Sequence, residues 1–209
     1  KEINLAKRLS KIFHLFHHFA MTKIFSANKI EFLLKIILLL AVLNTAYLSW
    51  RYLGLREDFV TAGTGICSVT DFVDCDKVLS TNEARAFYVP NALLGFGFFF
   101  GCFLWLIIGL RLGENYRYHV IRTLVFWLVV ATFLTFRFIW LLVQLPALCP
   151  LCPWNHLLTY LALIFTFLLW RKTPPSHEKA ESKPLILLVT LCVGQFFIWL
   201  ILWSIFSGK

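Results

Sequence analysis

Six cysteines are the residues of this chain whose type and spacing could do chemistry, and one pair of them is closely spaced. Cys149 and Cys152 are separated by two residues, one of them Pro150, at the start of a long apolar run. If that run is a helix, one thiolate lies near its N-terminus, where the partial positive charge lowers the thiol pKa and makes the sulfur more reactive. A disulfide that closes so small a ring contributes little stability. The spacing therefore favours a reactive pair over a structural bond.

A second pair, Cys67 and Cys75, has seven residues between its members and lies in an acidic loop. Two such pairs could also form structural disulfides or bind zinc. The spacing of Cys67 and Cys75 is unusual for zinc, so we expect redox chemistry and no metal, with static disulfides and a metal site as the open alternatives. Cys102 and Cys192 lie inside apolar runs, which is typical of small buried hydrophobic residues.

The elements that must position these cysteines are those of a membrane protein. The 209 residues are 59% hydrophobic and only 15% charged, far more apolar than a soluble domain. Helices long enough to cross a bilayer are predicted for residues 36–53, 89–110, 120–145, 152–170 and 185–206. These runs lack the alternation of a membrane β-barrel. The sequence therefore predicts an all-α integral membrane protein, a four-helix transmembrane bundle plus a fifth transmembrane helix.

The distribution of Lys and Arg predicts how this bundle is oriented. Most of them lie before the first run, between the second and third, and between the fourth and fifth, whereas the long loop 54–88 is rich in Asp and Glu. The N-terminus is therefore expected in the cytoplasm and the four paired cysteines on the other side. Topology and contact with membrane lipid explain the net charge of +9, and we expect no nucleic-acid partner.

Composition also divides the chain into segments. Residues 1–29 are a basic amphipathic segment expected at the cytoplasmic surface, and residues 30–172 hold the four-helix catalytic bundle with its outer loop 54–88. Residues 173–184 are a polar cytoplasmic linker, and residues 185–209 contain the fifth transmembrane helix. All four paired cysteines thus belong to the bundle.

Arg137 lies well inside the third predicted span, in its outer half. A charge inside the membrane is a functional candidate when it faces the bundle. A long arginine stem can instead extend to the membrane surface, and the sequence leaves both interpretations open.

Three motifs follow one another along the bundle. They are the segment from Gly65 to Thr81 with Cys67 and Cys75, the segment Pro90-Asn91-Ala-Leu-Leu-Gly95, and Cys149-Pro-Leu-Cys152. Together they resemble the vitamin K epoxide reductase family. The disulfide-bond formation protein B family does similar chemistry, but there the closely spaced pair comes first in the chain, and here it comes last. The resemblance implies a four-helix bundle around a quinone, with the loop cysteines as an electron shuttle.

The resemblance also implies roles for individual residues. Cys149 and Cys152 match the active-site pair, with Cys152 nearer the quinone, and Cys67 and Cys75 match the shuttle. Asn91 matches the quinone-contacting asparagine of the family. The other residues expected at the quinone are Thr81, Phe87, Trp154 and His156.

Two positions depart from the family pattern. Thr81 stands where serine is usual, with Ser80 beside it, and His156 stands where the vertebrate enzyme has tyrosine. A histidine can also donate a hydrogen bond to a quinone oxygen. The change makes vitamin K itself a less favoured substrate.

These observations predict a quinone-dependent protein-disulfide oxidoreductase. Electrons would pass from a separate thioredoxin-fold protein through the loop pair and the Cys149/Cys152 pair to ubiquinone or menaquinone, supporting disulfide bond formation. We expect a bacterial-type homologue without a fused thioredoxin-like domain, in the inner membrane, with its cysteines on the periplasmic side. The alternatives are a non-catalytic membrane protein with structural disulfides or a metal site, and a vitamin K epoxide or quinone reductase proper.

Overall fold

The computed structural model describes residues 26–86, 89–111, 113–145, 147–174 and 201. Phe87, most of segment 1–29, most of linker 173–184 and nearly all of the predicted fifth span lie outside these residues. The described part contains four long helices, α2 (Ala27–Arg56), α4 (Asn91–Arg111), α5 (Glu114–Val143) and α6 (Leu151–Lys172). Each is long and apolar enough to cross a membrane. The predicted all-α membrane bundle is confirmed, and the fifth helix stays a prediction.

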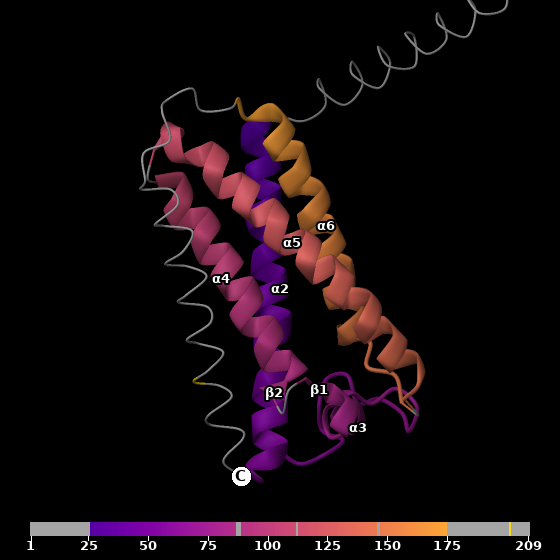
Figure 1. The fold of residues 1–209 in the computed structure, drawn as a ribbon. Coiled ribbons are helices and arrows are strands. Elements are labelled where there is room, and N and C mark those ends of the chain that lie inside the picture. Colours follow the sequence, from indigo (N-terminus) through magenta and orange to yellow (C-terminus); the bar gives the residue numbers. More distant parts are fainter. Residues whose placement is uncertain (1–25, 87–88, 112, 146, 175–200, 202–209) are drawn as a thin grey trace, which may run out of the picture.

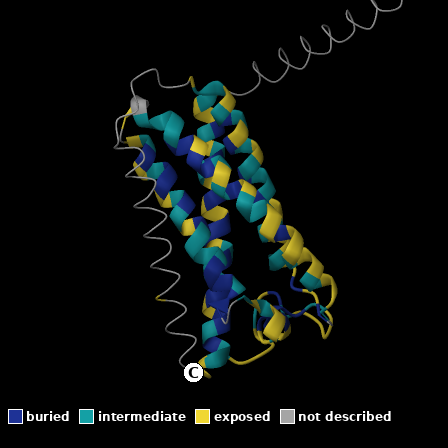
Figure 2. Ribbon diagram, viewed as in Figure 1, coloured by how far each residue is buried: buried dark blue, intermediate teal, exposed yellow. Residues whose placement is uncertain are grey.

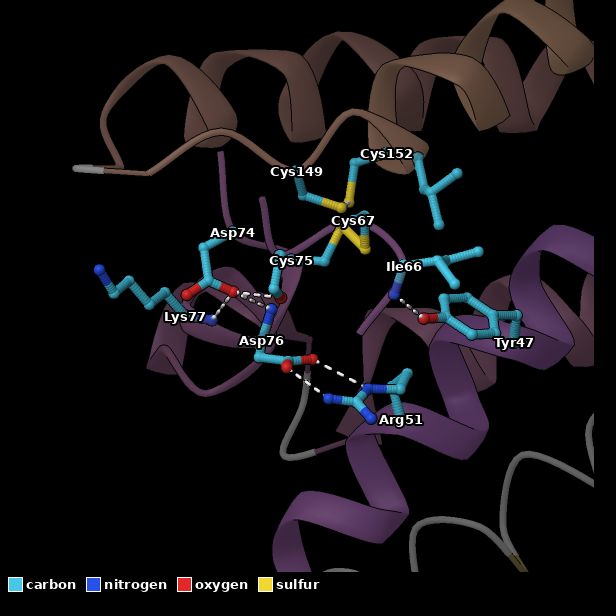
Figure 3. The surroundings of a disulfide bond; sticks show 12 residues. Tyr47, Arg51, Ile66, Cys67, Asp74, Cys75, Asp76, Lys77, Cys149 and Cys152 are labelled. Atoms are coloured by element: carbon cyan, nitrogen blue, oxygen red, sulfur yellow. Dashed lines mark hydrogen bonds and ion pairs between the residues drawn. A yellow bond between two sulfur atoms is a disulfide. The ribbon is translucent and has the colours of Figure 1, made fainter. Parts of the chain in front are cut away.

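The four long helices form a closed bundle in which neighbours run in opposite directions (Figure 1). Helix α2 packs against α4 and α6, and α5 packs against the same two helices from the other side. One end of the bundle therefore carries the C-termini of α2 and α5 together with the N-termini of α4 and α6. We call it the cysteine end, because both cysteine pairs lie there (Figures 1 and 3).

The main hydrophobic core fills the half of the bundle away from the cysteine end. In α2, buried residues recur at helical spacing, among them Ile30, Leu34 and Leu38. They pack with residues of the other three helices, including Leu124 and Leu158. Toward the cysteine end α5 becomes largely exposed (Figure 2). Contacts other than the main core must therefore order the cysteine end.

Short elements between α2 and α4 cover the cysteine end. They are α3 (Cys75–Leu79), the 3-10 helix η1 (Asn82–Ala84) and the strands β1 (Arg85–Ala86) and β2 (Val89–Pro90), which pair antiparallel. A second hydrophobic cluster joins α3 to the end of α2 and to the segment before α6, with Leu48, Val78 and Ala147 among its members. This cluster fixes the loop on the end of the bundle.

Three of the four described long helices, α2, α5 and α6, begin before their predicted spans, and the difference is largest for α2. The apolar run 36–53 predicted the first span, whereas α2 has 30 residues, a length of about 45 Å. Hydropathy detects only the segment in contact with lipid, but backbone hydrogen bonds continue into the polar turns at both ends. At the end away from the cysteines, Lys35 Nζ pairs with Glu31 Oε1 at 2.7 Å.

Candidate active site

The loop pair is joined as a disulfide between Cys67 and Cys75, with 5.6 Å between the two Cα atoms. Cys75 is the first residue of α3, and Asp74 caps this short helix by accepting hydrogen bonds from the backbone N–H groups of Asp76 and Lys77. Both cysteines are buried. On the other side of the disulfide, the backbone N–H of Ile66 donates to Tyr47 Oη of α2 at 3.0 Å. The loop backbone is therefore fixed on both sides of its disulfide.

The second pair lies where the chain enters α6. Cys149 and Cys152 are free thiols whose sulfur atoms are 2.9 Å apart. Pro150 occupies the N-cap position of α6, so Cys152 falls in the first helical turn and its backbone N–H donates to the carbonyl of Cys149 at 3.2 Å. Cys149 is fully buried, and Cys152 is half-buried. The pair can therefore exchange between a dithiol and a disulfide within one short turn.

A backbone bridge brings the two pairs together. Val73, just before the second loop cysteine, pairs in parallel with Leu148, just before Cys149. The carbonyl of Leu148 accepts from Asp74 N at 3.1 Å, and Leu148 N donates to the carbonyl of Phe72 at 2.7 Å. Figure 3 shows the loop disulfide facing the Cys149/Cys152 pair, and Cys75 and Cys149 share one hydrophobic cluster. The structure thus holds a disulfide and a dithiol side by side.

The electrostatic surroundings favour a thiolate at Cys149. The hydrogen bond from the Cys152 thiol lowers the pKa of Cys149 below its usual value, burial opposes this, and the backbone N–H groups of Cys152 and Leu151 assist it. A nearby carboxylate, Asp76, acts in the opposite direction. A thiolate at this position is stabilised both as a nucleophile and as a leaving group.

Asp74 is also held as an anion. Burial alone would raise the pKa of its carboxyl, but hydrogen bonds from Ser68 Oγ and from the backbone N–H groups of Lys77 and Asp76 lower it overall. The contact from Ser68 Oγ is 2.6 Å. Because Ser68 follows Cys67 directly, this carboxylate connects the two arms of the loop.

Sequence reasoning missed a buried ion pair between Arg51 of α2 and Asp76 of α3. Their side chains are only 3% and 2% exposed, and Arg51 Nε donates to Asp76 Oδ1 at 3.1 Å. Asp76 follows Cys75 directly. The available signal was an arginine near the end of the first predicted span and an acidic residue beside a loop cysteine. Only the fold shows that these two residues pair.

A polar contact between α2 and α6 was also missed. Asn44 Nδ2 donates to the carbonyl of Leu151, inside the two-residue-spaced motif, at 3.0 Å, and approaches Asn155 Oδ1 at 3.5 Å. Gly95 of α4 lies beside this layer, since a Cβ atom there would be 3.1 Å from Thr45 Cγ2. The glycine therefore allows α4 to approach α2 closely next to Cys152.

Four of the five residues predicted for the quinone, all but Phe87, belong to the described residues, and each has its own surroundings. Asn91 Nδ2 donates to the carbonyl of Glu83 at 3.2 Å, and its Oδ1 is buried without a partner among the described residues. Thr81 Oγ1 is bonded to the carbonyl of Val78 at 2.8 Å. His156 stacks on Phe138 of α5 with ring centroids 6.4 Å apart, and Trp154 is 47% exposed.

The buried oxygen of Asn91 is a possible contact for a bound ligand. It is a hydrogen-bond acceptor without a partner among the described residues, and aromatic and apolar side chains of α5 and α6 are exposed on the bundle. Within the described ranges no three His, Cys, Asp or Glu side chains are grouped as a metal would require. An aromatic ligand with hydroxyl groups therefore suits the donor set.

The comparisons with known proteins agree with this geometry. Residues 32–167 match the model of the vitamin K epoxide reductase family, a range that includes most of α2, all of α4 and α5, most of α6, and both cysteine pairs. The searches of curated proteins and of solved structures each find no match. With a bundle of membrane-spanning helices and two adjoining cysteine pairs, this chain belongs to the vitamin K epoxide reductase family and is a multi-pass membrane oxidoreductase acting on thiols and disulfides.

Proposed function

We propose that this protein is a thiol oxidase that passes electrons from a separate thioredoxin-fold protein to a membrane quinone, and so supports disulfide bond formation. The observation that carries the proposal is the backbone bridge between Val73 and Leu148, which aligns an oxidised loop pair with the reduced Cys149/Cys152 pair. Two cysteine pairs held side by side are what a two-step relay requires. A static pair of disulfides has no need for this alignment.

The relay proceeds by thiol–disulfide exchange. A dithiol on the partner reduces the Cys67–Cys75 disulfide and leaves as a disulfide. The Cys75 thiolate then attacks the Cys149 sulfur of an oxidised Cys149–Cys152 bond, and Cys152 leaves as a thiolate that takes up a proton. Cys67 next attacks Cys75, which restores the loop disulfide and releases Cys149. Two electrons and two protons thus reach the Cys149/Cys152 pair, which is the state seen here.

The environment of Cys149 fits the central position in this relay. Cys149 must leave from the Cys75–Cys149 mixed disulfide, and a lower leaving-group pKa speeds that step. The hydrogen bond from the Cys152 thiol lowers the pKa of Cys149. Cys152, half-buried in the first turn of α6, is the member of the pair that faces the electron acceptor in this proposal.

Ubiquinone or menaquinone would supply the acceptor of two electrons and two protons. Asn91, His156, Trp154, Phe87 and Thr81 are the residues proposed to hold it. Since the Asn91 amide nitrogen is bonded to Glu83, its free oxygen can accept a hydrogen bond from a hydroxyl of the reduced ring. His156 is oriented by stacking on Phe138 and can donate to an oxygen of the oxidised ring.

The proposed setting follows from the charge pattern of the sequence. The cysteine end would face the periplasm of a bacterium, with the bundle in the inner membrane and the quinone reached from the lipid. The partner would be a soluble periplasmic thioredoxin-fold protein. A disulfide-forming relay needs this oxidising compartment, since cytosolic thiols are kept reduced.

The test separates the two half-reactions of the purified protein. Cys75→Ser should prevent oxidation of a thioredoxin-fold dithiol while a small dithiol that reaches Cys149 still drives quinone reduction. A Cys67→Ser, Cys152→Ser double variant should form the Cys75–Cys149 disulfide when diamide is added as the two-electron oxidant. Full turnover of the protein partner by Cys75→Ser would disprove the relay order.

A second measurement tests the quinone residues. Asn91→Ala and His156→Ala should each raise the KM for quinone or lower kcat. The hydrogen bond from His156 to a ring oxygen strengthens as negative charge develops there, and the Asn91 oxygen accepts from the hydroxyl that forms on the reduced ring. Thiol exchange between the partner and the loop pair should stay normal in stopped-flow experiments. Equal loss in both half-reactions, or in neither, would assign these two residues to structure alone.

A further inference from the structure

The ion pair between Arg51 and Asp76 is the most completely buried charge pair of the cysteine end. Arg51 Nε and Nη2 contact the two carboxylate oxygens of Asp76, the bidentate geometry that arginine forms with a carboxylate. Its Nη2 also donates to the carbonyl of Thr61 at 3.2 Å, and Nη1 to Thr64 Oγ1 at 3.4 Å. One side chain of α2 therefore contacts the loop on both sides of its disulfide.

The loop backbone is shaped to receive this guanidinium. Gly63 N donates to Asp76 Oδ2 at 3.0 Å. A Cβ atom at Gly65 would be 3.2 Å from Arg51 Nε and 3.3 Å from Tyr47 Oη, so a side chain at Gly65 would crowd both groups. The segment that leads to Cys67 thus passes directly over Arg51.

Stability alone does not account for such a pair. Removing two charges from water is costly, and a buried ion pair can often be replaced by apolar residues at no loss of stability. Breaking it on one side is costly, because the remaining charge is buried without a partner. Here the remaining charge would be Asp76, directly after Cys75 and close enough to Cys149 to act on it electrostatically.

We propose that Arg51 is a positioning residue of the electron relay, which holds Cys75 against Cys149 through Asp76 and neutralises the carboxylate beside the Cys149 sulfur. The proposal rests on the relay described above and adds a residue outside its cysteines and quinone contacts. Figure 3 shows the arrangement, with Arg51 beneath Asp76 and the two sulfur pairs on the other side of α3.

Arg51 has two proposed effects, and suitable variants can separate them. Its charge compensates the charge of Asp76, and its contacts hold the loop on α2. Among the described residues, the ionisable groups that act on Cys149 are Cys152 of α6 and Asp76 of α3, and Asp76 is itself paired with Arg51 of α2. Loss of Arg51 alone leaves the Asp76 charge uncompensated, which raises the pKa of Cys149. Loss of both charges removes that effect but still releases the loop from α2.

The experiment compares four variants of the full chain in quinone-free detergent micelles: Arg51→Met, Arg51→Lys, Asp76→Asn and the Arg51→Met, Asp76→Asn double variant. After reduction, the rate of Cys149 alkylation by iodoacetamide is followed across a pH series by mass spectrometry of the Cys149 peptide. Formation of the Cys75–Cys149 bond is timed separately in the Cys67→Ser, Cys152→Ser background after addition of diamide, which takes up the two electrons and two protons that the two thiols release. Asp71→Asn is the matched control, since it breaks the exposed Lys77–Asp71 pair of the same loop.

Arg51→Met should move the alkylation midpoint of Cys149 to higher pH, and the double variant should return it toward the wild-type value. Formation of the Cys75–Cys149 bond should be slower by roughly tenfold in both, within the range seen for coupled neighbouring residues. Arg51→Lys keeps the charge but not the bidentate contact, so its midpoint should stay near wild type while bond formation slows. Asp71→Asn should change neither value.

An unchanged midpoint and an unchanged bond-formation rate in Arg51→Met would overturn the proposal. A midpoint as high in the double variant as in Arg51→Met would also overturn it, because the carboxylate would then not be the cause. Since Arg51→Met can misfold, Arg51→Lys and Asp76→Asn keep the test decisive. The alkylation profile needs neither quinone nor partner, so its outcome is independent of whether the wild-type protein proves to be a thiol oxidase.

Discussion

Cys149 and Cys152 have different surroundings although they are three positions apart. Cys149 is fully buried and accepts a hydrogen bond from the thiol of Cys152, whereas Cys152 is half-buried at the start of α6. This asymmetry suits Cys149 to thiol exchange, and in the proposed relay it leaves Cys152 as the group nearest the quinone.

Removing the Cys152 thiol should change the titration of Cys149. Its hydrogen bond is the largest influence that lowers the pKa of Cys149, so Cys152→Ala should shift the alkylation midpoint of Cys149 to higher pH. Cys152→Ser should shift it less, because a hydroxyl can still donate. At a pH between the old and new midpoints, Cys152→Ala should therefore react more slowly than wild type. Equal profiles in all three proteins would contradict this assignment.

The rate of quinone reduction tests the role of Cys152 directly. Cys152→Ser should abolish quinone reduction, a loss on the order of a thousandfold or more as for removal of other reactive groups. Cys149 cannot replace Cys152, because Cys149 is fully buried. Cys102→Ala is the control, since Cys102 is a buried lone cysteine of α4. Quinol formation measured by absorbance should be normal in the control. Substantial quinone reduction by Cys152→Ser would exclude Cys152 as the final donor.

At the scale of elements, the cysteine end depends on close approach of α2 and α4 beside Cys152. A Cβ atom on Gly95 would lie 3.1 Å from Thr45 Cγ2, whereas one on Gly97 would have no neighbour within 4 Å. Gly95→Val should therefore separate the two helices and cost about 1–3 kcal/mol of unfolding free energy, as overpacking does. Gly97→Val on the same helix should cost much less. Thermal unfolding in detergent compares the two, and equal losses would argue against tight packing at Gly95.

The structure decides between the two interpretations of Arg137 in α5. Among the described residues this side chain is exposed on the outside of the bundle, which matches an arginine whose long stem reaches the membrane surface. Arg137→Leu should leave quinone-linked turnover within about twofold of wild type, the usual range for exposed substitutions. A larger fall at normal expression would instead place the charge in the reaction path.

At the scale of the whole molecule, all four relay cysteines lie at one end of the bundle. At the other end of the bundle, Glu31 forms ion pairs with Lys35 and with Arg117. If the charge pattern sets the orientation, a membrane-impermeant thiol reagent added outside spheroplasts should label Cys149 after reduction. The same reagent should fail to label it in sealed inverted vesicles. Labelling only in inverted vesicles would show that the protein has the opposite orientation in the membrane.

The sequence by itself determined the class of molecule and the residues of its chemistry. Hydropathy is a local property, so runs such as 89–110 predicted the observed helices to within a few residues at most ends. The order and spacing of Cys67, Cys75, Cys149 and Cys152 likewise carried the family resemblance that the match over residues 32–167 bears out. Both signals are contained in short stretches of chain.

Only the tertiary structure decided how distant residues meet. The Val73–Leu148 bridge, the Arg51–Asp76 ion pair and the hydrogen bond from Asn44 to the carbonyl of Leu151 each join segments far apart in sequence. No local pattern specifies such partners, because they depend on which helix faces pack together and on where the loop folds back onto α2. The alignment of the two cysteine pairs is a result of that packing.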